Sequence, residues 1–203
     1  MNKEKHNRIY LEEKQAEEYF NHIQTHPINV SEQKLLKALF PKLTNKNCLE
    51  IGCAGAIYSR EMLNKGALKV DSLDYSPSMI KMAKSLTNNK VTYYLKDINS
   101  PIILKSTYDF ICASYILHYS KKLAQTLSSI IELLNTKGIL IFSVPNPQEF
   151  QQGENQLFLG KKKVVTNFFN YNQETYIEIL KKSGEILEIE KNADVFIVKF
   201  QKA

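Results

Sequence analysis

Apolar residues near the start of the chain recur at the three- and four-residue spacing of a helix face. We expect a first helix over residues 11–26, and a second that begins at the N-cap residue Ser31 and stops at Pro41. Both helices precede the first predicted strand, and we interpret them as packing elements or as a lid over a site. Their apolar stripes consist of Ala16, Tyr19, Phe20 and Ile23 in the first helix and Leu35, Leu36, Leu39 and Phe40 in the second.

From Asn47 onward, short apolar runs alternate with helical patterns. Ser76 and Pro77 favour a helix start, because serine caps the first turn and proline fits its first position. Alternation of strands and helices predicts a Rossmann-like α/β fold with a doubly wound, mostly parallel sheet. The predicted strands cover residues 48–51, 70–74, 91–95, 108–113 and 139–144, and the helices between them cover residues 58–65, 76–88 and 121–134.

The last part of the chain departs from this alternation. Residues 145–163 are rich in turn formers and lack a period, and we interpret them as a long functional loop. A helix is expected over residues 173–183, and the strands at 186–190 and 195–200 are close enough to form a C-terminal antiparallel hairpin. We therefore expect a single domain, with N-terminal helices over residues 1–44, a core over 45–144, and the loop, helix and hairpin over 145–203.

Length and composition limit the function classes. A chain of 203 residues suits one domain, and 43% hydrophobic and 24% charged residues are ordinary for a globular protein. The net charge of +6 comes from scattered lysines rather than from a basic stripe with aromatic residues, so nucleic-acid binding is disfavoured. The three cysteines lack metal-type spacing, and we expect no metal site. Without a secretory signal or an apolar run of membrane-spanning length, we expect a cytoplasmic protein that does not contact a membrane.

A turn after the first predicted strand carries the candidate chemistry. Glu50 and Gly52 end an apolar run, and the small residues 53–56 follow. Small residues at this position leave bare backbone against which a ligand can lie. Asp74 ends the second predicted strand, where a carboxylate in doubly wound sheets reaches the hydroxyls of a ribose. The pattern therefore predicts a cofactor that contains a nucleoside.

Five further segments follow one another in a characteristic order: LEIGC at 49–53, LDYSPSM at 73–79, KDI at 96–98, YDFICASYILHY at 108–119 and KGILIFS at 137–143. Through these motifs and the closing hairpin, the chain resembles the class I S-adenosylmethionine-dependent methyltransferases, in particular the small-molecule methyltransferase family. The resemblance implies the seven-stranded methyltransferase fold, S-adenosylmethionine as cofactor and S-adenosylhomocysteine as its product. It also implies a small-molecule methyl acceptor as the partner.

The resemblance implies residue roles as well. Asp74 would accept hydrogen bonds from both ribose hydroxyls, Asp97 would accept one from the adenine amino group, and the Ile98 backbone would lie at a ring nitrogen. Glu50 and the strand end at 113–114 would lie by the methionine moiety. The expected cofactor-binding residues are Glu50, Gly52, Cys53, Ala54, Asp74, Tyr75, Met79, Asp97, Ile98, Ala113 and Ser114.

One departure from the family pattern leaves alternatives open. Ala54 and Ala56 stand where the family has glycines, and a position that needs a positive φ would resist alanine. A catalytically silent binding protein with the same fold is therefore an alternative. An NAD-type oxidoreductase shares the first turn and its acid, but Ile57 stands at the third glycine of that fingerprint.

The expected reaction is a direct displacement, in which an O, N, S or C atom of the acceptor attacks the methyl group of the sulfonium. Such a transfer can proceed by holding donor and nucleophile in line. His118 is the candidate catalytic residue, as a general base that titrates near neutral pH, with packing at a helix start as the competing interpretation. We expect acceptor specificity from the N-terminal helices, residues 145–163 and the aromatic segment 168–171.

Overall fold

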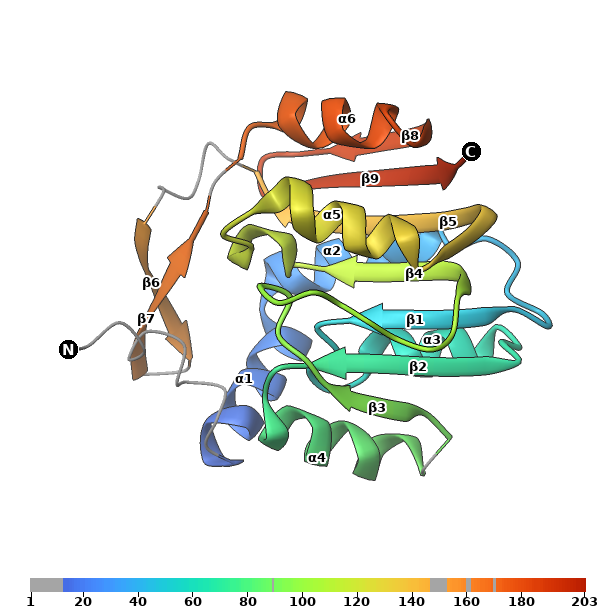
Figure 1. The fold of residues 1–203 in the computed structure, drawn as a ribbon. Helices are drawn as coiled ribbons and strands as arrows, with labels where there is room; N and C mark the ends of the chain where they lie inside the picture. The colour runs from blue at the N-terminus through green and yellow to red at the C-terminus, as the bar shows by residue number, and fades with distance from the viewer. Residues whose placement is uncertain (1–12, 89, 147–152, 160–161, 170) are drawn as a thin grey trace.

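A seven-stranded sheet forms the centre of the molecule (Figure 1). The structure is a computed structural model that describes residues 13–88, 90–146, 153–159, 162–169 and 171–203. The strand order is β3-β2-β1-β4-β5-β9-β8, in which β1 to β5 run parallel and β9 is antiparallel to both β5 and β8. This confirms the predicted fold class. The strands are β1 (Asn47–Ile51), β2 (Lys69–Asp74), β3 (Thr92–Leu95), β4 (Tyr108–Ser114), β5 (Leu134–Pro145), β8 (Gly184–Lys191) and β9 (Val195–Lys202).

Helices cover both faces of the sheet, so the central strands are apolar on both sides. One face packs against α5 and α6, and the other packs against α2 and α3. Successive residues of β1 divide between the two layers, with Cys48 on the α2–α3 side and Leu49 on the α5–α6 side. No helix among the described residues is long and apolar enough to cross a membrane. The helices are α1 (Glu13–Thr25), α2 (Pro27–Ala38), α3 (Ile57–Asn64), α4 (Pro77–Thr87), α5 (Leu123–Glu132) and α6 (Gln173–Lys181), with a short 3₁₀ helix η2 (Leu117–Tyr119).

The prediction that Ser31 caps the second helix is wrong. Helix α2 begins four residues earlier, at Pro27, and its N-cap is His26 in an extended conformation. Proline is preorganised for the first helical position and lacks the N–H group that would go unpaired there, so it starts this helix better than the interior serine. The predicted end of this helix is nearer to the observed one, because α2 ends at Ala38, three residues before Pro41. Ser76 does cap α4 as predicted, with its side chain accepting a hydrogen bond from the Met79 N–H.

The long loop predicted over residues 145–163 is also wrong. The chain forms strands β6 (Gly153–Leu159) and β7 (Lys162–Phe168), which pair as an antiparallel hairpin separate from the main sheet. The parts of the predicted loop at 147–152 and 160–161 lie outside the described residues. The sequence lacks the alternation of apolar and polar residues that a half-buried strand shows, while backbone pairing within a hairpin does not depend on that pattern. Strand β5 likewise begins earlier than predicted, at Leu134.

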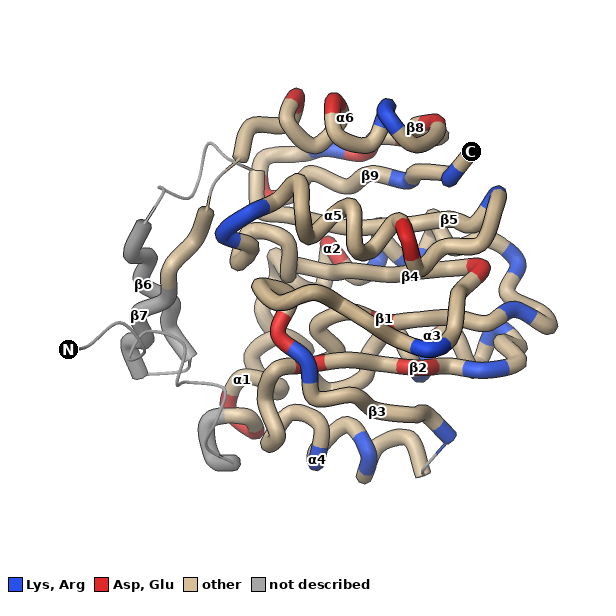
Figure 2. The backbone as a smooth tube through the Cα atoms, viewed as in Figure 1, with Lys and Arg blue, Asp and Glu red and all other residues tan. Residues whose placement is uncertain are grey.

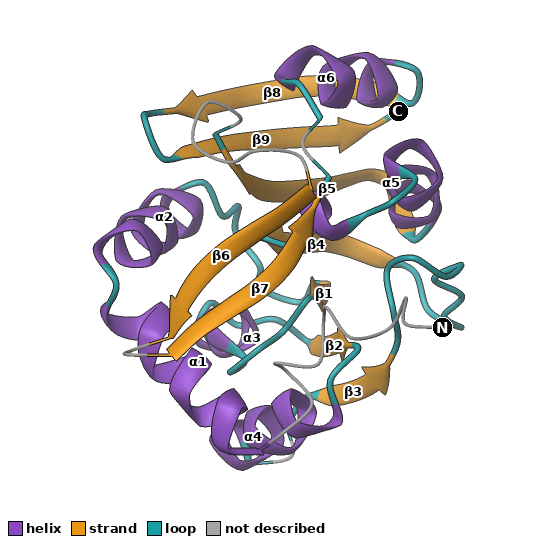
Figure 3. Cartoon of the chain, turned by 90° about the vertical axis from the view of Figure 1, so that its left-hand side faces the viewer, coloured by secondary structure: helices purple, strands orange, loops and turns teal. Residues whose placement is uncertain are grey.

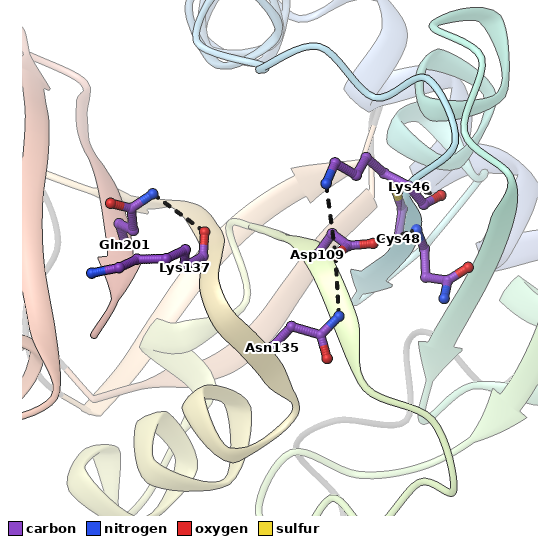
Figure 4. A network of polar contacts seen from close by, with 7 residues as sticks. Lys46, Cys48, Asp109, Asn135, Lys137 and Gln201 are labelled. Carbon is purple, nitrogen blue, oxygen red and sulfur yellow. Dashed lines mark hydrogen bonds and ion pairs between the residues drawn. The ribbon is translucent and has the colours of Figure 1, made fainter.

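Side-chain contacts join the strands at the amino ends of the sheet (Figure 4). Asp109 accepts hydrogen bonds from the Asn47 N–H at 2.9 Å and from the Asn135 side-chain amide at 3.1 Å, which links the starts of β1, β4 and β5. The Lys46 ammonium lies 3.8 Å from the same carboxylate. These polar contacts are therefore structural, and they lie at the edge opposite to the carboxyl ends of the parallel strands, where doubly wound sheets bind ligands.

Helix α6 gives a direct test of local stability. Asn172 is its N-cap, and the side-chain oxygen accepts from the Thr175 N–H at 2.8 Å, while Tyr176 and Leu180 bury the helix against the sheet. We expect Asn172→Ala to lower the free energy of unfolding by about 1 kcal/mol, because the first turn loses this acceptor. Urea unfolding followed by circular dichroism measures the loss. Asn172→Ser, which keeps a capping oxygen, should stay within a few tenths of a kcal/mol of wild type; equal losses in both variants would contradict the capping role.

Candidate functional site

The candidate residues gather at the carboxyl ends of the parallel strands. Strand β1 lies between β2 and β4, so the chain leaves β1 at the point where the strand order reverses. Figure 3 views this edge directly, with the β6–β7 hairpin in front of the sheet and α1 to one side of the strand ends. Helix α1 contacts α2, α4 and β6. The N-terminal helices and the hairpin therefore surround the edge where doubly wound sheets bind their ligands.

The turn after β1 uses left-handed backbone at three positions. Gly52 has φ 75°, Ala54 has φ 40° and Ala56 has φ 55°. The two alanines thus adopt the conformation that was expected to resist them, at a cost of about 1–2 kcal/mol each. Gly55 is not among these positions, but the Phe20 ring of α1 fills the space that a Cβ atom would occupy there. Glycine is needed at position 55 for packing, and α1 lies directly against the turn.

Asp74 joins the turn to the start of α4. Its carboxylate accepts hydrogen bonds from the Ala54 N–H at 3.1 Å and from the Ser76 N–H at 2.9 Å, and the residue is 8% exposed. Burial raises the pKa of Asp74 to about 6, although the backbone N–H groups oppose the shift. The backbone N–H groups of Ser76, Ala54 and Tyr75 all bond this carboxylate, which has about four acceptor sites. The carboxylate is therefore preorganised at the carboxyl end of β2, with acceptor capacity left for a ligand.

Glu50 lies behind the turn rather than at its surface. Its carboxylate accepts from the Tyr58 N–H at 3.2 Å, the Ser59 N–H at 2.9 Å and the Ser59 hydroxyl at 2.5 Å. The two N–H groups belong to the first turn of α3, and the N-cap residue Ala56 has no side-chain acceptor for their hydrogen bonds. Burial raises the pKa of Glu50 to about 7. Glu50 thus caps α3 from β1 and holds the turn between them.

A second buried carboxylate, from α2, escaped the sequence analysis. Glu32 is 1% exposed and accepts hydrogen bonds from the hydroxyls of Tyr58, Ser114 and Ser143, at 2.6, 2.8 and 2.5 Å. Burial raises the pKa of Glu32, while the three hydroxyls oppose the shift. The sequence carried one signal for it: Glu32 precedes Leu36 by four residues and so lies on the buried side of α2.

The backbone beyond β4 is strained beside this carboxylate. Tyr115 has φ 44°, a left-handed conformation that is uncommon for a bulky residue and is typical of functional sites. Its N–H lies 3.0 Å from the carbonyl oxygen and 3.1 Å from the hydroxyl oxygen of Ser143. The next residue, Ile116, places its side chain against Gly52. The end of β4 and the turn after β1 are therefore in contact, as the shared site predicted for them requires.

The remaining predicted residues separate into two groups. Asp97 is exposed just after the end of β3. Burial is the main cause of the raised pKa of Tyr75, and the neighbouring side chains of Asp74, Tyr119 and Asp97 raise it further. Asp97, Asp74 and Tyr75 thus face a common region. Cys53 and Met79, in contrast, bury their side chains in local packing, Cys53 with Ala83 and Met79 with Ala16. Their backbone groups are also engaged within the protein, since the Cys53 N–H donates to the Leu73 carbonyl oxygen and the Met79 N–H donates to Ser76.

The aromatic segment after the hairpin packs against η2. The Phe168 ring lies 4.4 Å from His118 between ring centroids, and the Phe169 N–H donates to the His118 carbonyl oxygen at 2.7 Å. The Tyr171 hydroxyl donates to the Ser120 carbonyl oxygen. Tyr19 approaches the same edge from α1, where burial and the nearby Tyr119, Asp74 and Glu32 side chains raise its pKa. Groups from both ends of the chain thus meet at the edge of the sheet.

Comparison with known proteins then decides the family. A sequence model described as a methyltransferase domain matches residues 19–188, most of the chain. The chain belongs to the methyltransferase domain family. The resemblance to the class I S-adenosylmethionine-dependent methyltransferases that the motifs indicated is confirmed.

Individual relatives of the methyltransferase domain share about three residues in ten with it. A protein of Haemophilus influenzae is 27% identical over 169 residues, which cover 77% of this chain and 66% of that protein. The malonyl-[acyl-carrier protein] O-methyltransferase of Bacillus cereus is 31% identical over 121 residues, which cover 58% of this chain and 44% of the relative. The chain thus spans between about half and two thirds of the length of these relatives.

A solved structure shares the fold of the methyltransferase domain. The N-methyltransferase NodS of Bradyrhizobium japonicum, in complex with S-adenosylhomocysteine, matches with a TM-score of 0.70 at 17% sequence identity. The match covers 97% of this chain and 99% of that one. At this level of identity the likeness shows the fold, and the site of the methyltransferase domain must be argued from its own residues.

Buried acids dominate the described site of the methyltransferase domain. Glu32, Glu50 and Asp74 come from α2, β1 and β2, and Asp97 follows β3 at the surface. Figure 2 marks the acidic positions along the backbone in red. No group of three or more His, Cys, Asp or Glu side chains among the described residues has the arrangement of a metal site. A site with several carboxylates close to a tight turn is suited to a ligand with positive charge and hydroxyl groups.

His118 gives a pH test for the methyltransferase domain. The imidazole is 4% exposed, and burial lowers its pKa from 6.5 to about 3, so the ring is neutral at neutral pH. Because the unfolded chain then binds the proton more tightly than the folded one, His118 stabilises the fold above pH 6.5 and loses that contribution as the pH falls towards 3. A conjugate acid of this strength makes a weak general base, which favours the packing interpretation.

We expect the difference in unfolding free energy between wild type and His118→Phe to fall by about 1.4 kcal/mol per pH unit below pH 6. The aromatic replacement keeps the packing against Phe168 but has no titrating group, so other acids cancel in the difference. Urea unfolding at pH 7, 6, 5 and 4 measures it. A difference that does not vary with pH would mean that His118 is exposed to solvent in the folded protein.

Proposed function

We propose that the chain transfers a methyl group from S-adenosylmethionine to a small-molecule acceptor by direct displacement and releases S-adenosylhomocysteine. The observation that carries the proposal is the position of Asp74. Its carboxylate lies at the carboxyl end of β2, hydrogen-bonded to the turn after β1 and to the start of α4. In doubly wound sheets this is the place from which an acid reaches a ribose.

The start of α3 supports this cofactor over a dinucleotide. A pyrophosphate binds at a helix N-terminus after the first strand, where free amides and the helix dipole favour negative charge. In this chain Glu50 already accepts from the Tyr58 and Ser59 amides of that helix. A pyrophosphate would find these donors occupied and would meet a carboxylate. S-adenosylmethionine carries a sulfonium and an ammonium but no phosphate, so the acidic surroundings suit it.

The chain's own residues divide the task of holding the cofactor. Asp74 accepts from the ribose hydroxyls, and Asp97 accepts from the adenine amino group with the Ile98 backbone beside it. Ala113 and Ser114 end β4 on the methionine side. Glu50 acts through the turn, where Gly52, Cys53 and Ala54 offer backbone, and Tyr75 and Met79 form the wall after β2. When bound, the cofactor supplies an electrophilic methyl group.

The acceptor would lie among the elements that surround the strand ends. These are α1, the β6–β7 hairpin and the segment from Phe168 to Tyr171, which contacts η2. Relatives such as that of Bacillus cereus are named malonyl-[acyl-carrier protein] O-methyltransferases, so a carboxyl group on a carrier is one acceptor to test. Holding donor and acceptor in line can by itself supply much of the rate enhancement. Lack of a strong general base in the described site is therefore compatible with transfer.

Calorimetric titration with S-adenosylhomocysteine, S-adenosylmethionine and NADH tests the cofactor. We expect the first two to bind and NADH not to bind. Binding of NADH alone would refute the methyltransferase proposal, and binding of none would favour a catalytically silent protein.

Asp74→Ala tests the ribose contact. We expect the affinity for S-adenosylhomocysteine to fall at least tenfold, about 1.4 kcal/mol, because two hydrogen bonds to a charged acceptor are lost. Asp109→Ala, at the amino ends of the strands, is the matched control and should leave the affinity unchanged. Wild-type affinity in a folded Asp74→Ala protein would refute the assignment.

Ala54→Gly and Ala56→Gly test whether the alanines impair the turn. The backbone at both positions is already left-handed, so the cost of that conformation falls on folding rather than on binding. We expect each variant to bind S-adenosylhomocysteine within about twofold of wild type. An increase of tenfold or more would show that the alanines hold the turn in a poorly binding form, as the silent alternative requires.

A further inference from the structure

The buried carboxylate of Glu32 connects the N-terminal helices to the ends of two strands. Its three hydroxyl partners come from three different elements: Tyr58 from α3, Ser114 from β4 and Ser143 from β5. Ser114 and Ser143 are direct neighbours in the β4–β5 register. One carboxylate oxygen accepts from both serines and the other accepts from Tyr58, so α2 is fastened to the sheet at the point where β4 ends.

The contact continues into strained backbone. The Ser143 hydroxyl donates to Glu32 and its oxygen accepts from the Tyr115 N–H. Tyr115 holds φ 44°, which persists only where the surroundings over-determine it. The hydrogen bonds from Ser143 to Glu32 and from Tyr115 to Ser143 help to hold the Tyr115 backbone in this conformation.

Stability alone is a weak reason to bury this acid. Placing a carboxylate in the interior costs several kcal/mol, and the hydroxyl partners together with the nearby charge of Lys37 recover only part of it, because burial still raises the pKa of Glu32. Buried polar groups can often be replaced by apolar residues without loss of stability. Glu32 lowers the stability of the fold and lies behind the end of β4, so a role in shaping the site explains its position better.

The geometry points to Glu32 as a positioning residue of the cofactor site. It holds the Ser114 side chain and, through Ser143, the Tyr115 backbone in the arrangement that receives the methionine end of S-adenosylmethionine. Glu32 does not itself contact the ligand, since it is covered by its hydroxyl partners. The inference rests on the proposed function, because it assigns the end of β4 to the methionine moiety.

Calorimetric titration with S-adenosylhomocysteine tests this role in the full chain. We expect Glu32→Ala to weaken binding about tenfold or more, and Ser143→Ala to weaken it similarly, since both interrupt one path. The double variant should bind no more weakly than the weaker single variant. Glu32→Gln keeps an oxygen for the two serines and a donor for the Tyr58 oxygen, and should restore the affinity to within about threefold of wild type.

Asp71→Ala is the matched control. Asp71 is a fully buried carboxylate in β2 that also accepts from a tyrosine hydroxyl, that of Tyr108 at 2.8 Å, but it lies away from the carboxyl end of its strand. We expect this variant to lose stability while keeping its affinity for S-adenosylhomocysteine.

Three results would overturn the inference. These are wild-type affinity in folded Glu32→Ala, an equal loss of affinity in Asp71→Ala, and additive losses in the double variant. If Glu32→Ala does not fold, Ser143→Ala and Glu32→Gln carry the test. A wild-type protein that binds neither S-adenosylhomocysteine nor S-adenosylmethionine would instead refute the proposed function.

Discussion

The capping of α3 by Glu50 is the interaction on which the site depends. A carboxylate at the end of β1 accepts the first amides of the following helix, a role that the N-cap alanine cannot perform. The turn between strand and helix is therefore held from within, and Ile116 and Phe20 pack against its glycines at positions 52 and 55. A tight turn of this kind leaves its outer backbone free for a ligand while its inner amides are satisfied.

Tyr58 extends this interaction to the rest of the carboxyl edge. Its backbone N–H donates to Glu50 and its phenol donates to Glu32, so one residue links the two buried acids. Ser59 bonds both Glu50 and Ser72, which brings β2 into the same network. Polar groups from β1, β2, β4, β5, α2 and α3 thus share one set of hydrogen bonds beneath the turn. Partial loss of such a network leaves buried groups unpaired, so its members are strongly coupled.

The sequence predicted those parts of the structure that local patterns determine. The mostly parallel sheet and its C-terminal antiparallel hairpin follow from the alternating runs, and the start of α4 follows from Ser76, whose side chain caps it as expected. The sequence favours a start of α2 at Ser31, because this good cap residue competes with Pro27, which fits the first turn better. It does not predict the β6–β7 hairpin, because neither segment has the alternation of apolar and polar residues that marks a half-buried strand.

The candidate site divides in the same way. The position of Asp74 at the carboxyl end of β2 is predictable, because an acid that ends an apolar run marks a strand end. The position of Glu32 is not, because its partners lie 26, 82 and 111 residues away in the sequence, and only the packing of α2 on the sheet brings them together. A lone acid on an apolar helix face was the one local sign of it. Long-range polar contacts of this kind depend on the tertiary fold, and no spacing along the chain encodes them.

The raised pKa values of Glu50 and Asp74 indicate that these buried acids lack a compensating positive charge among the described residues. Burial brings the pKa of Glu50 to about 7 and that of Asp74 to about 6, so both acids favour the protonated form more than they do in the unfolded chain. Their contribution to stability is therefore present at low pH and is lost as the pH rises through those values. At neutral pH Asp74 is therefore mostly ionised and Glu50 is partly ionised. A cationic ligand that donates hydrogen bonds compensates that charge, and ligand binding and folding then stabilise each other.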